Sequence, residues 1–288
     1  MLAIKHVLFP IDFSERTYAA VPFVQSMAKR FGAKITLMSV APPYWYALDP
    51  GVPMVVDMEE VREHFQKRLK KVLIREFEGF DVQRVVEIGE AAEGLVRYAH
   101  NQAVDLIMMP THGYGPFRSL LLGSVTAKVL HDARCPVWTA AHVEEAQKDH
   151  VAAHNILCAV DGTPKSEPLI QWAAEFAKAR GAGLRIAHAT GGVQGWPERH
   201  LNRDFEEAIR QEAKTTIARL LESAGVNAPV CVAVGDVAGA VQEEAVRRAA
   251  DLVVIGRGSI HERLGRLRTH AYGIIRQRSE ERRVGKEC

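Results

Sequence analysis

The chain contains one segment whose residue types and spacing suit the binding of phosphate. It runs from Asp105 to Val137 and reads DLIMMPTHGYGPFRSLLLGSVTAKVLHDARCPV. The segment predicts a buried strand at Leu106–Met109, a glycine-bearing loop, and a helix that begins at Gly123-Ser124. Backbone N–H groups at such a loop and helix start bind phosphate, because a helix N-terminus carries unsatisfied donors and a partial positive charge.

Apolar strands and amphipathic helices alternate around this segment and would position it at one edge of a sheet. Near-continuous apolar strands are typical of parallel sheets covered by helices on both faces. Right-handed crossovers then predict an α/β fold with a doubly wound parallel sheet, and we expect the strand order 3-2-1-4-5, in which strands 1 and 4 flank the switch point. The expected strands of the first half are Val7–Pro10, Ile35–Val40, Val82–Ile88, Leu106–Met109 and Pro136–Ala140, with helices from Ser14 or Glu15 to Phe31, around Val61–Val72, at Ala91–Asn101 and after Gly123.

Ligands of doubly wound sheets bind beyond the carboxyl ends of the strands, where the strand order reverses. Asp12 follows the first strand, Val40 ends the second and Pro110–Gly115 follows the fourth, so all three share one rim. We expect Asp12 to accept hydrogen bonds from an adenine or a ribose, and Val40 to form a wall of the base pocket. Backbone donors to phosphates are expected from Gly113, Gly123, Ser124 and Val125, and the Ser124 hydroxyl adds another.

Each of these residues also has a purely structural alternative. Asp12 would then cap the following helix, and Gly113 would only relieve a tight turn. Ser124 would be no more than a helix start, and His112 is better explained as a loop or contact histidine than as a catalytic base. The common rim favours a ligand site, and no residue is assigned to catalysis.

Other nucleotide and metal motifs do not fit the chain. A GxxxxGK[ST] loop is absent, which argues against Walker-type phosphate transfer. Gly113-Tyr114-Gly115 is followed by Arg118 instead of the third glycine of a dinucleotide fingerprint, and it follows the fourth strand where that fingerprint follows the first. The sequence shows neither a metal-ligand spacing nor a serine nucleophile elbow.

The second half repeats the first. The offset is 149 residues from Asp12 to Asp161 and 146 residues from Asp105 to Asp251. Between them, Gly89-Glu90 matches Gly235-Asp236, also at an offset of 146. A repeat of this length indicates duplicated domains, because solenoid units are much shorter. The expected strands of the second half are Ile156–Val160, Leu184–Ala189, Val230–Val234 and Leu252–Ile255, with helices through Leu169–Phe176, at about Glu198–Ser223, a short one before Leu252, and near Thr269–Gln277.

Length and composition agree with two intracellular domains. The chain has 288 residues, 47% of them hydrophobic, and a formal net charge of +2, which indicates neither a nucleic-acid-binding face nor a membrane span. The N-terminus does not resemble a signal peptide and the four cysteines fit no disulfide framework, so we expect a cytoplasmic location. The expected boundaries are 1–141 for the first domain, 142–153 for a linker, and 154–277 for the second domain.

The last residues, Arg278–Cys288, read RSEERRVGKEC and look like the translation of a sequencing adapter. We therefore expect 278–288 to be an artefactual tail and the second domain to be truncated before its last strand. An ordinary charged tail is the alternative. A missing final strand would leave unpaired backbone groups at the sheet edge and lower the solubility of the chain.

The two halves resemble universal stress protein domains over about Lys5–Ala140 and His154–Gln277. The ATP-binding signature of that family is glycine, two residues, glycine, nine residues, then glycine and serine or threonine. The first half reads Pro110, two residues, Gly113, nine residues, Gly123-Ser124, so only the first glycine departs. Proline has no N–H, which excludes a backbone donor contact at that position.

The resemblance implies a Rossmann-like fold of the adenine nucleotide alpha hydrolase type and a site carried over residue by residue. Asp12 and Val40 match the adenine-side positions. The ribose and phosphate positions are matched by Met109, Gly113, Gly123, Ser124 and Val125, with His112 placed among the binding residues. In the second half Ser259 replaces a glycine and Thr269-His270 replaces the glycine–serine pair, so strong nucleotide binding is not expected there.

The leading hypothesis is a regulatory protein of the stress response that binds ATP, with or without Mg²⁺, and hydrolyses it little or not at all. The alternatives are a nucleotide-free scaffold that acts through protein contacts, and a slow ATPase or an adenylyl- or phosphoryl-transfer enzyme. The resemblance also implies an internal pseudo-dimer of the two domains through their final strands, and a homodimer as a further assembly. The expected partner is an adenine nucleotide; nucleic acid and membrane are not expected partners.

Overall fold

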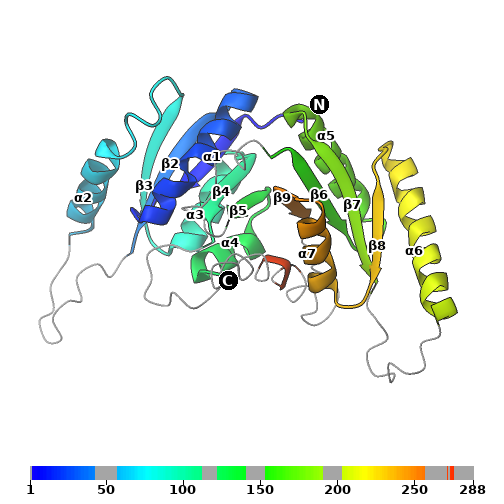
Figure 1. Cartoon of the computed structure of the whole chain (residues 1–288). Helices are drawn as coiled ribbons and strands as arrows, with labels where there is room; N and C mark the ends of the chain where they lie inside the picture. The colour runs from blue at the N-terminus through cyan, green and yellow to red at the C-terminus, as the bar shows by residue number, and fades with distance from the viewer. Residues whose placement is uncertain are drawn as a thin grey trace, which may run out of the picture. The chain divides into compact units, whose positions relative to one another are not determined.

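The computed structural model describes residues 2–42, 57–111, 122–140, 153–190, 203–256, 271 and 273–275. The chain divides into two compact units, Ala3–Ala146, and Gln147–Cys288 together with Met1–Leu2. Each unit is an α/β domain and is described by itself (Figure 1). Within the described ranges, no helix has the length and apolar character needed to cross a membrane.

The first domain is a five-stranded parallel sheet with the order β3-β2-β1-β4-β5, which confirms the predicted strand order. The register pairs Val7 of β1 with Ile35 of β2 and Ile107 of β4 with Val137 of β5. The strands are β1 (His6–Pro10), β2 (Lys34–Ala41), β3 (Val82–Ile88), β4 (Leu106–Pro110) and β5 (Val137–Ala140).

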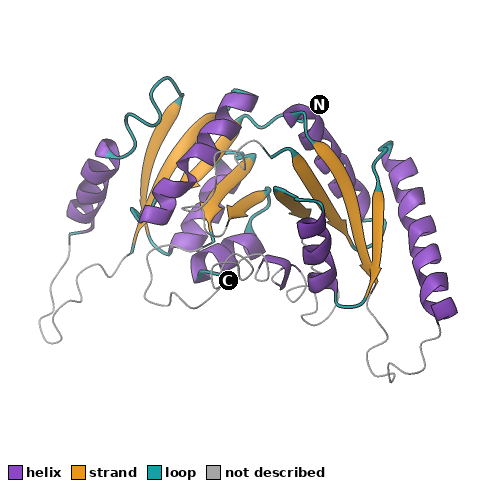
Figure 2. Ribbon diagram, viewed as in Figure 1, coloured by secondary structure: helices purple, strands orange, loops and turns teal. Residues whose placement is uncertain are grey.

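Among the described residues, four helices cover this sheet, and right-handed crossovers place the first two and the last two on opposite faces (Figure 2). Helix α1 begins after Ser14, whose side chain accepts a hydrogen bond from the Thr17 N–H, and ends at Gly32 in a left-handed conformation with φ 64°. The helices are α1 (Glu15–Phe31), α2 (Met58–Lys71), α3 (Ala91–Asn101) and α4 (Ser124–Asp132).

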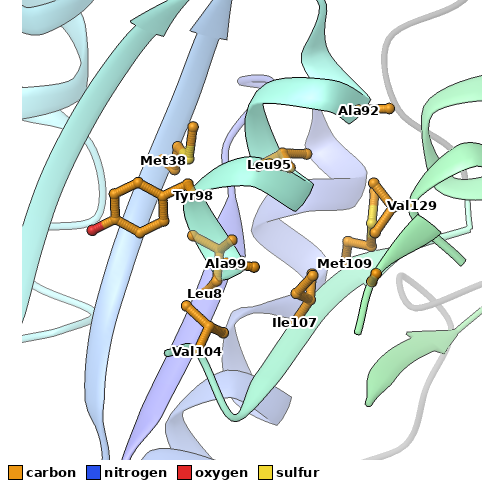
Figure 3. Close-up of a cluster of buried hydrophobic side chains, with 11 residues drawn as sticks. Leu8, Met38, Ala92, Leu95, Tyr98, Ala99, Val104, Ile107, Met109 and Val129 are labelled. Carbon is orange, nitrogen blue, oxygen red and sulfur yellow. The ribbon is translucent and has the colours of Figure 1, made fainter. Parts of the chain in front are cut away.

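A cluster of buried apolar side chains fixes α3 and α4 against the sheet (Figure 3). It joins Leu8 of β1, Met38 of β2 and Ile107 of β4 to Leu95 of α3 and Val129 of α4. All five side chains are 2% exposed or less. Burying a side chain of this size contributes about 1.5–3 kcal/mol, so this face of the sheet holds the carboxyl ends of β1, β2 and β4 in place.

The opposite face is packed by aromatic pairs. Phe9 of β1 meets Phe77 edge-on with ring centroids 6.5 Å apart, and Phe23 of α1 lies 5.0 Å from Trp138 of β5. Phe9 is fully buried. The β5 strand is therefore tied to α1 as well as to β4.

The second domain has a four-stranded parallel sheet within the described residues, in the order β8-β7-β6-β9. Its buried cluster includes Leu157, Val241 and Ile274, and the described residues 271 and 273–275 are helical. The rest of the helix predicted near Thr269–Gln277 lies outside the described residues. The elements are β6 (Asn155–Val160), α5 (Ser166–Arg180), β7 (Gly183–Thr190), α6 (Arg203–Ala224), β8 (Val230–Val234), α7 (Val237–Arg247) and β9 (Leu252–Ile255).

A buried histidine lies at the start of β1. His6 is 3% exposed, its Nδ1 lies 3.2 Å from the carbonyl oxygen of Gln102, and its Nε2 lies 2.8 Å from Oγ1 of Thr36. The carbonyl can only accept, so Nδ1 carries the hydrogen and the neutral Nε2 accepts from the Thr36 hydroxyl. Burial lowers the pKa of His6, and nearby Lys34 lowers it further.

We expect the stability of the first domain to fall as the pH falls below about 6.5, the pKa of an unfolded histidine. The folded state keeps His6 neutral to a lower pH, so the unfolded state binds a proton first and the slope is at most about 1.4 kcal/mol per pH unit. Urea unfolding between pH 7.5 and 5.5 would measure it. In His6→Gln this part of the pH dependence should vanish; an unchanged pH profile would contradict the assignment.

Candidate functional site

The strand order reverses between β1 and β4, and there the carboxyl ends of the two strands are not paired. The β1–β4 register covers Val7↔Leu106 and Leu8↔Ile107 only. Pro10 and Pro110, which end the two strands, have no N–H to donate. A crevice outside the carboxyl ends of the strands at such a reversal is where ligands of these folds bind.

The second domain differs at the equivalent place. Its β6–β9 register continues over four pairs, from Ile156↔Leu252 to Ala159↔Ile255. The two central strands are thus hydrogen-bonded along more of their length than in the first domain.

Asp12 lies at this rim two residues after the end of β1, and its side chain is exposed. One of its carboxylate oxygens accepts three hydrogen bonds. Its Oδ1 accepts from the Ser14 N–H at 3.0 Å, from the Ser14 hydroxyl at 2.7 Å and from the Thr17 hydroxyl. Ser14 is 9% exposed and Thr17 1% exposed. Ser14 and not Asp12 is the N-cap of α1, so the helix-cap alternative for Asp12 is wrong. The hydroxyls instead fix the orientation of the carboxylate.

The second domain repeats this arrangement around Asp161. Its Oδ1 accepts from the Thr163 N–H at 3.0 Å, the Thr163 hydroxyl at 2.8 Å and the Ser166 hydroxyl at 2.6 Å. Burial would raise the pKa of Asp161, but the hydrogen bonds from Ser166 and Thr163 outweigh it and lower the pKa. Sequence reasoning missed these hydroxyls, although a hydroxyl two and five residues after each aspartate is visible in both halves.

The residue after each aspartate has a left-handed backbone. Phe13 has φ 62° and Gly162 has φ 78°. Such a conformation strains a residue with a side chain. The Phe13 ring is held by Phe65, at 6.2 Å between centroids, and by Arg68, whose guanidinium lies 3.9 Å above it. Contacts with α2 thus hold the turn that presents Asp12.

The N-terminus of α4 follows the end of β4 at this edge of the sheet, and no described side chain caps it. Its N-cap residue is Gly123, which has no side chain to accept a hydrogen bond from the first turn. That turn holds no acidic residue. The Gly123 N–H donates to the Thr111 carbonyl at 2.8 Å and the Thr126 hydroxyl to the Pro110 carbonyl at 3.2 Å, which tie the helix to the end of β4. Ser124 is exposed and Val125 half-buried. These two hydrogen bonds fix the start of α4, and the backbone N–H groups of its first turn can bind an anion.

Three predicted site residues belong to one apolar cluster. Val40 and Val125 are half-buried at its margin, while Met109 is 6% exposed inside it. A Cβ on Gly94 of α3 would lie 3.4 Å from Cγ2 of Val40, so α3 closes tightly on this side. The structure brings Val40, Met109 and Val125 together as an apolar wall, with Met109 supporting it from behind.

His112 and Gly113 lie outside the described residues, as do Ser259 and Thr269-His270 of the second domain. Among the described residues, no group of three or more His, Cys, Asp or Glu side chains could hold a metal ion. In the second domain, His188 of β7 donates from Nδ1 to the Val160 carbonyl at 2.9 Å, and its ring would contact a Cβ on Gly162. An imidazole therefore fills space beside the Asp161 turn.

The fold defines a protein of two tandem α/β domains, each built on a parallel sheet whose strand order reverses at its first strand. The universal stress protein family model matches residues 3–140 and 153–271. The chain therefore belongs to the universal stress protein family, with two copies of the domain in tandem.

Similar proteins agree with this placement. A universal stress protein of Mycolicibacterium smegmatis is 28% identical over 188 residues, covering 63% of both chains, so this chain spans less than two-thirds of that relative. One from Methanocaldococcus jannaschii is 28% identical over 152 residues, 46% of this chain and 92% of that relative. A solved universal stress protein of Archaeoglobus fulgidus shares the fold, with a TM-score of 0.63, 21% identity, and 98% and 93% coverage of the two chains.

Proposed function

We propose that the first domain binds an adenine nucleotide, ATP in the first instance, and that the chain is a cytoplasmic regulatory protein of the stress response. The observation that carries the proposal is the α4 N-terminus, which has no side-chain cap and no acidic residue in its first turn. It is hydrogen-bonded to the end of β4, the strand next to β1 in the sheet. Family membership makes an adenine nucleotide the leading candidate for the anion.

The proposed pose follows the elements. Asp12 accepts hydrogen bonds from the base or ribose, while Val40 and Val125 line the apolar side. The donors of Ser124 and Val125 and the Ser124 hydroxyl hold phosphates at the positive end of α4. His112 and Gly113 complete the phosphate loop in this proposal. A Mg²⁺ ion would arrive with the nucleotide and bind its phosphates.

We propose little or no hydrolysis at this site. Oδ1 of Asp12 already accepts hydrogen bonds from Ser14 and Thr17, which makes it a fixed structural acceptor. Phosphoryl transfer also needs a group that positions the attacking water. The first turn of α4, where the phosphates are proposed to bind, holds no acidic residue that would take that role.

The second domain is proposed to support the first without strong nucleotide binding. Its central strands stay paired to Ala159↔Ile255, and His188 packs against Gly162 beside Asp161. Its phosphate turn carries Ser259 where the family signature has glycine. We propose the linker at 142–153 as the boundary between the two functions.

Equilibrium binding of labelled ATP to the full chain tests the proposal. We expect one saturable site per chain. Asp161→Asn in the second domain should leave it intact, because its donors keep an amide oxygen as acceptor. Absence of saturable binding up to millimolar ATP would contradict the proposal and favour a nucleotide-free scaffold. Release of inorganic phosphate at more than a trace rate would contradict the low-hydrolysis part.

The first sheet ends in β5, which pairs with β4 alone among the described strands. Such an edge presents unpaired backbone groups that suit addition of another strand. We propose that β5 pairs with a partner strand, within the chain as a pseudo-dimer or between two chains as a homodimer. Sedimentation equilibrium, compared with the chain mass of 31.9 kDa, separates the two assemblies.

A further inference from the structure

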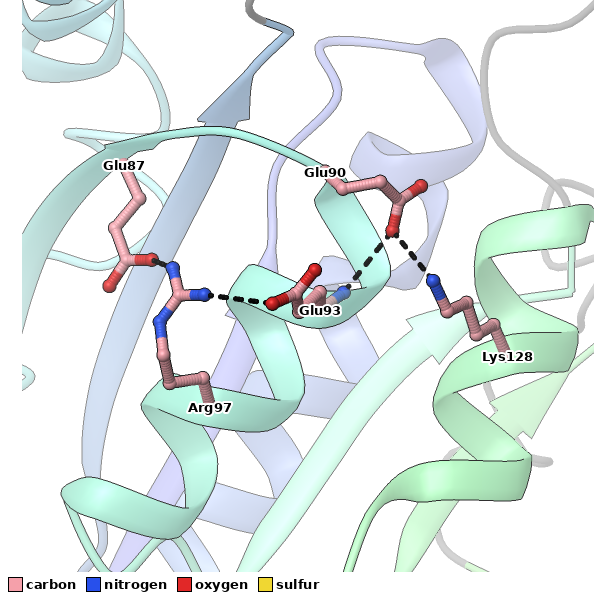
Figure 4. A network of polar contacts seen from close by, with 5 residues as sticks. All are labelled: Glu87, Glu90, Glu93, Arg97 and Lys128. Atoms are coloured by element: carbon pink, nitrogen blue, oxygen red, sulfur yellow. Dashed lines mark hydrogen bonds and ion pairs between the residues drawn. The ribbon is translucent and has the colours of Figure 1, made fainter.

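An ion pair joins the N-cap residue of α3 to the middle of α4. Nζ of Lys128 on α4 lies 3.2 Å from Oε2 of Glu90, the N-cap residue of α3 (Figure 4). The same Glu90 oxygen accepts from the Glu93 N–H at 3.4 Å. Both side chains are half-exposed, at 51% for Lys128 and 57% for Glu90. The pair is therefore open to exchange with a ligand.

Lys128 stands one helical turn after Ser124. Residues four apart share a helix face with Cβ atoms about 5–6 Å apart, and helical side chains lean towards the N-terminus. The side chain of Lys128 is therefore expected to lean towards the first turn of α4. Its contact with Glu90 places the ammonium at the start of the neighbouring helix α3.

The neighbouring charges are already matched. Arg97 pairs with Glu87 at 2.7 Å and with Glu93 at 3.6 Å (Figure 4). Glu90 would still accept the hydrogen bond from the Glu93 N–H if Lys128 moved away. Exchange of partners by Lys128 therefore leaves the Glu90 carboxylate with a hydrogen bond, at the positive end of α3.

We propose that Lys128 leaves Glu90 and binds the phosphate chain of the nucleotide, so that the Glu90–Lys128 pair sets the preference for phosphorylated over unphosphorylated ligands. The inference rests on the proposed function. Lys128 touches the ligand, and Glu90 is a positioning residue that competes for its ammonium. The ligand class is a nucleoside carrying a phosphate chain, and its affinity rises with the number of phosphates.

The first test measures ATP and adenosine binding separately by calorimetry on the full chain. Lys128→Gln should weaken ATP by about tenfold, the usual effect of losing one charge-assisted hydrogen bond, and leave adenosine unchanged. Lys128→Arg should retain most of the ATP affinity because it keeps the charge. An ATP-to-adenosine ratio unchanged in Lys128→Gln would overturn the inference.

The second test concerns competition by Glu90. Glu90→Gln keeps an oxygen for the Glu93 N–H but releases Lys128, so ATP should bind about threefold more tightly. In the Lys128→Gln background the same change should have no effect. If Glu90→Gln still tightens ATP binding in the Lys128→Gln background, Glu90 acts on the ligand by its own charge. That result would overturn the proposed exchange of partners by Lys128.

A matched control lies in the second domain. Asp236 caps α7 by accepting from the Gly239 N–H at 2.7 Å, so Asp236→Asn makes the same charge change at an equivalent helix start. It should leave both affinities unchanged, and a gain in ATP affinity equal to that of Glu90→Gln would show an effect of net charge alone and overturn the inference. If neither ATP nor adenosine binds the unaltered chain, the proposed function fails. If both bind and the Lys128 variants do not change their ratio, only this inference fails.

Discussion

Replacing Ser124 with glutamate is expected to stabilise the first domain slightly and to remove ATP binding. Ser124 is the exposed first residue of α4, whose first turn holds no acidic side chain. A carboxylate there interacts favourably with the helix dipole, by about 0.5 kcal/mol. The same carboxylate occupies the proposed phosphate position and repels phosphate, which should weaken ATP by about a hundredfold.

The opposite signs of the two effects make this variant informative. Urea unfolding followed by circular dichroism would report stability, and calorimetry would report ATP affinity. Ser124→Ala is the control, since it removes only the hydroxyl and keeps the backbone donors; its ATP affinity should fall by only a few fold. If the glutamate variant binds ATP like the unaltered chain, phosphates do not bind at the α4 N-terminus.

Local sequence patterns predicted the fold because its elements are defined by local physics. The bounds of β3 (Val82–Ile88) and α3 (Ala91–Asn101) match the prediction residue for residue. An apolar run, the Gly89 turn with φ 148° and the Glu90 cap all lie within a few residues of each other. The strand order is the one typical of Rossmann-type sheets, and right-handed crossovers, which are nearly universal, set the face that each helix covers. The duplication showed the pattern of the first four strands a second time.

The contacts that shape the site were beyond such patterns. Glu90 and Lys128 are 38 residues apart, and only the packing of α3 against α4 brings them together. Likewise, the β1–β4 register stops after Leu8↔Ile107, and the pairing of two strands this far apart in the sequence is not encoded in a local pattern. The orientation of Asp12 has a local origin, yet both Asp12 and Ser14 are residue types that cap helices, and only the geometry shows that Ser14 caps α1.

Substitutions of Asp12 are expected to have the second large effect. Asp12→Ala tests its role in stability, and Asp12→Asn tests its role in ligand binding. Asp12→Ala leaves the Ser14 N–H and the hydroxyls of Ser14 and Thr17 without their acceptor, and Thr17 is 1% exposed. Unpaired buried donors cost about 1–3 kcal/mol each, and the hydroxyls can rotate to other acceptors. We therefore expect a loss of about 2–4 kcal/mol in the free energy of unfolding, measured by urea titration.

Asp12→Asn should keep the fold and lose the ligand. The three donors hydrogen-bond to the amide oxygen of the asparagine, which takes the position of Oδ1. The free energy of unfolding should therefore change by less than about 1 kcal/mol. The amide NH₂ then replaces the acceptor offered to the base or ribose, so ATP and adenosine should both weaken by at least about tenfold. Lys128→Gln, by contrast, should weaken ATP alone. Unchanged adenosine binding in Asp12→Asn would place Asp12 outside the nucleoside contacts and leave it a purely structural residue of the β1–α1 turn, as its twin Asp161 is proposed to be.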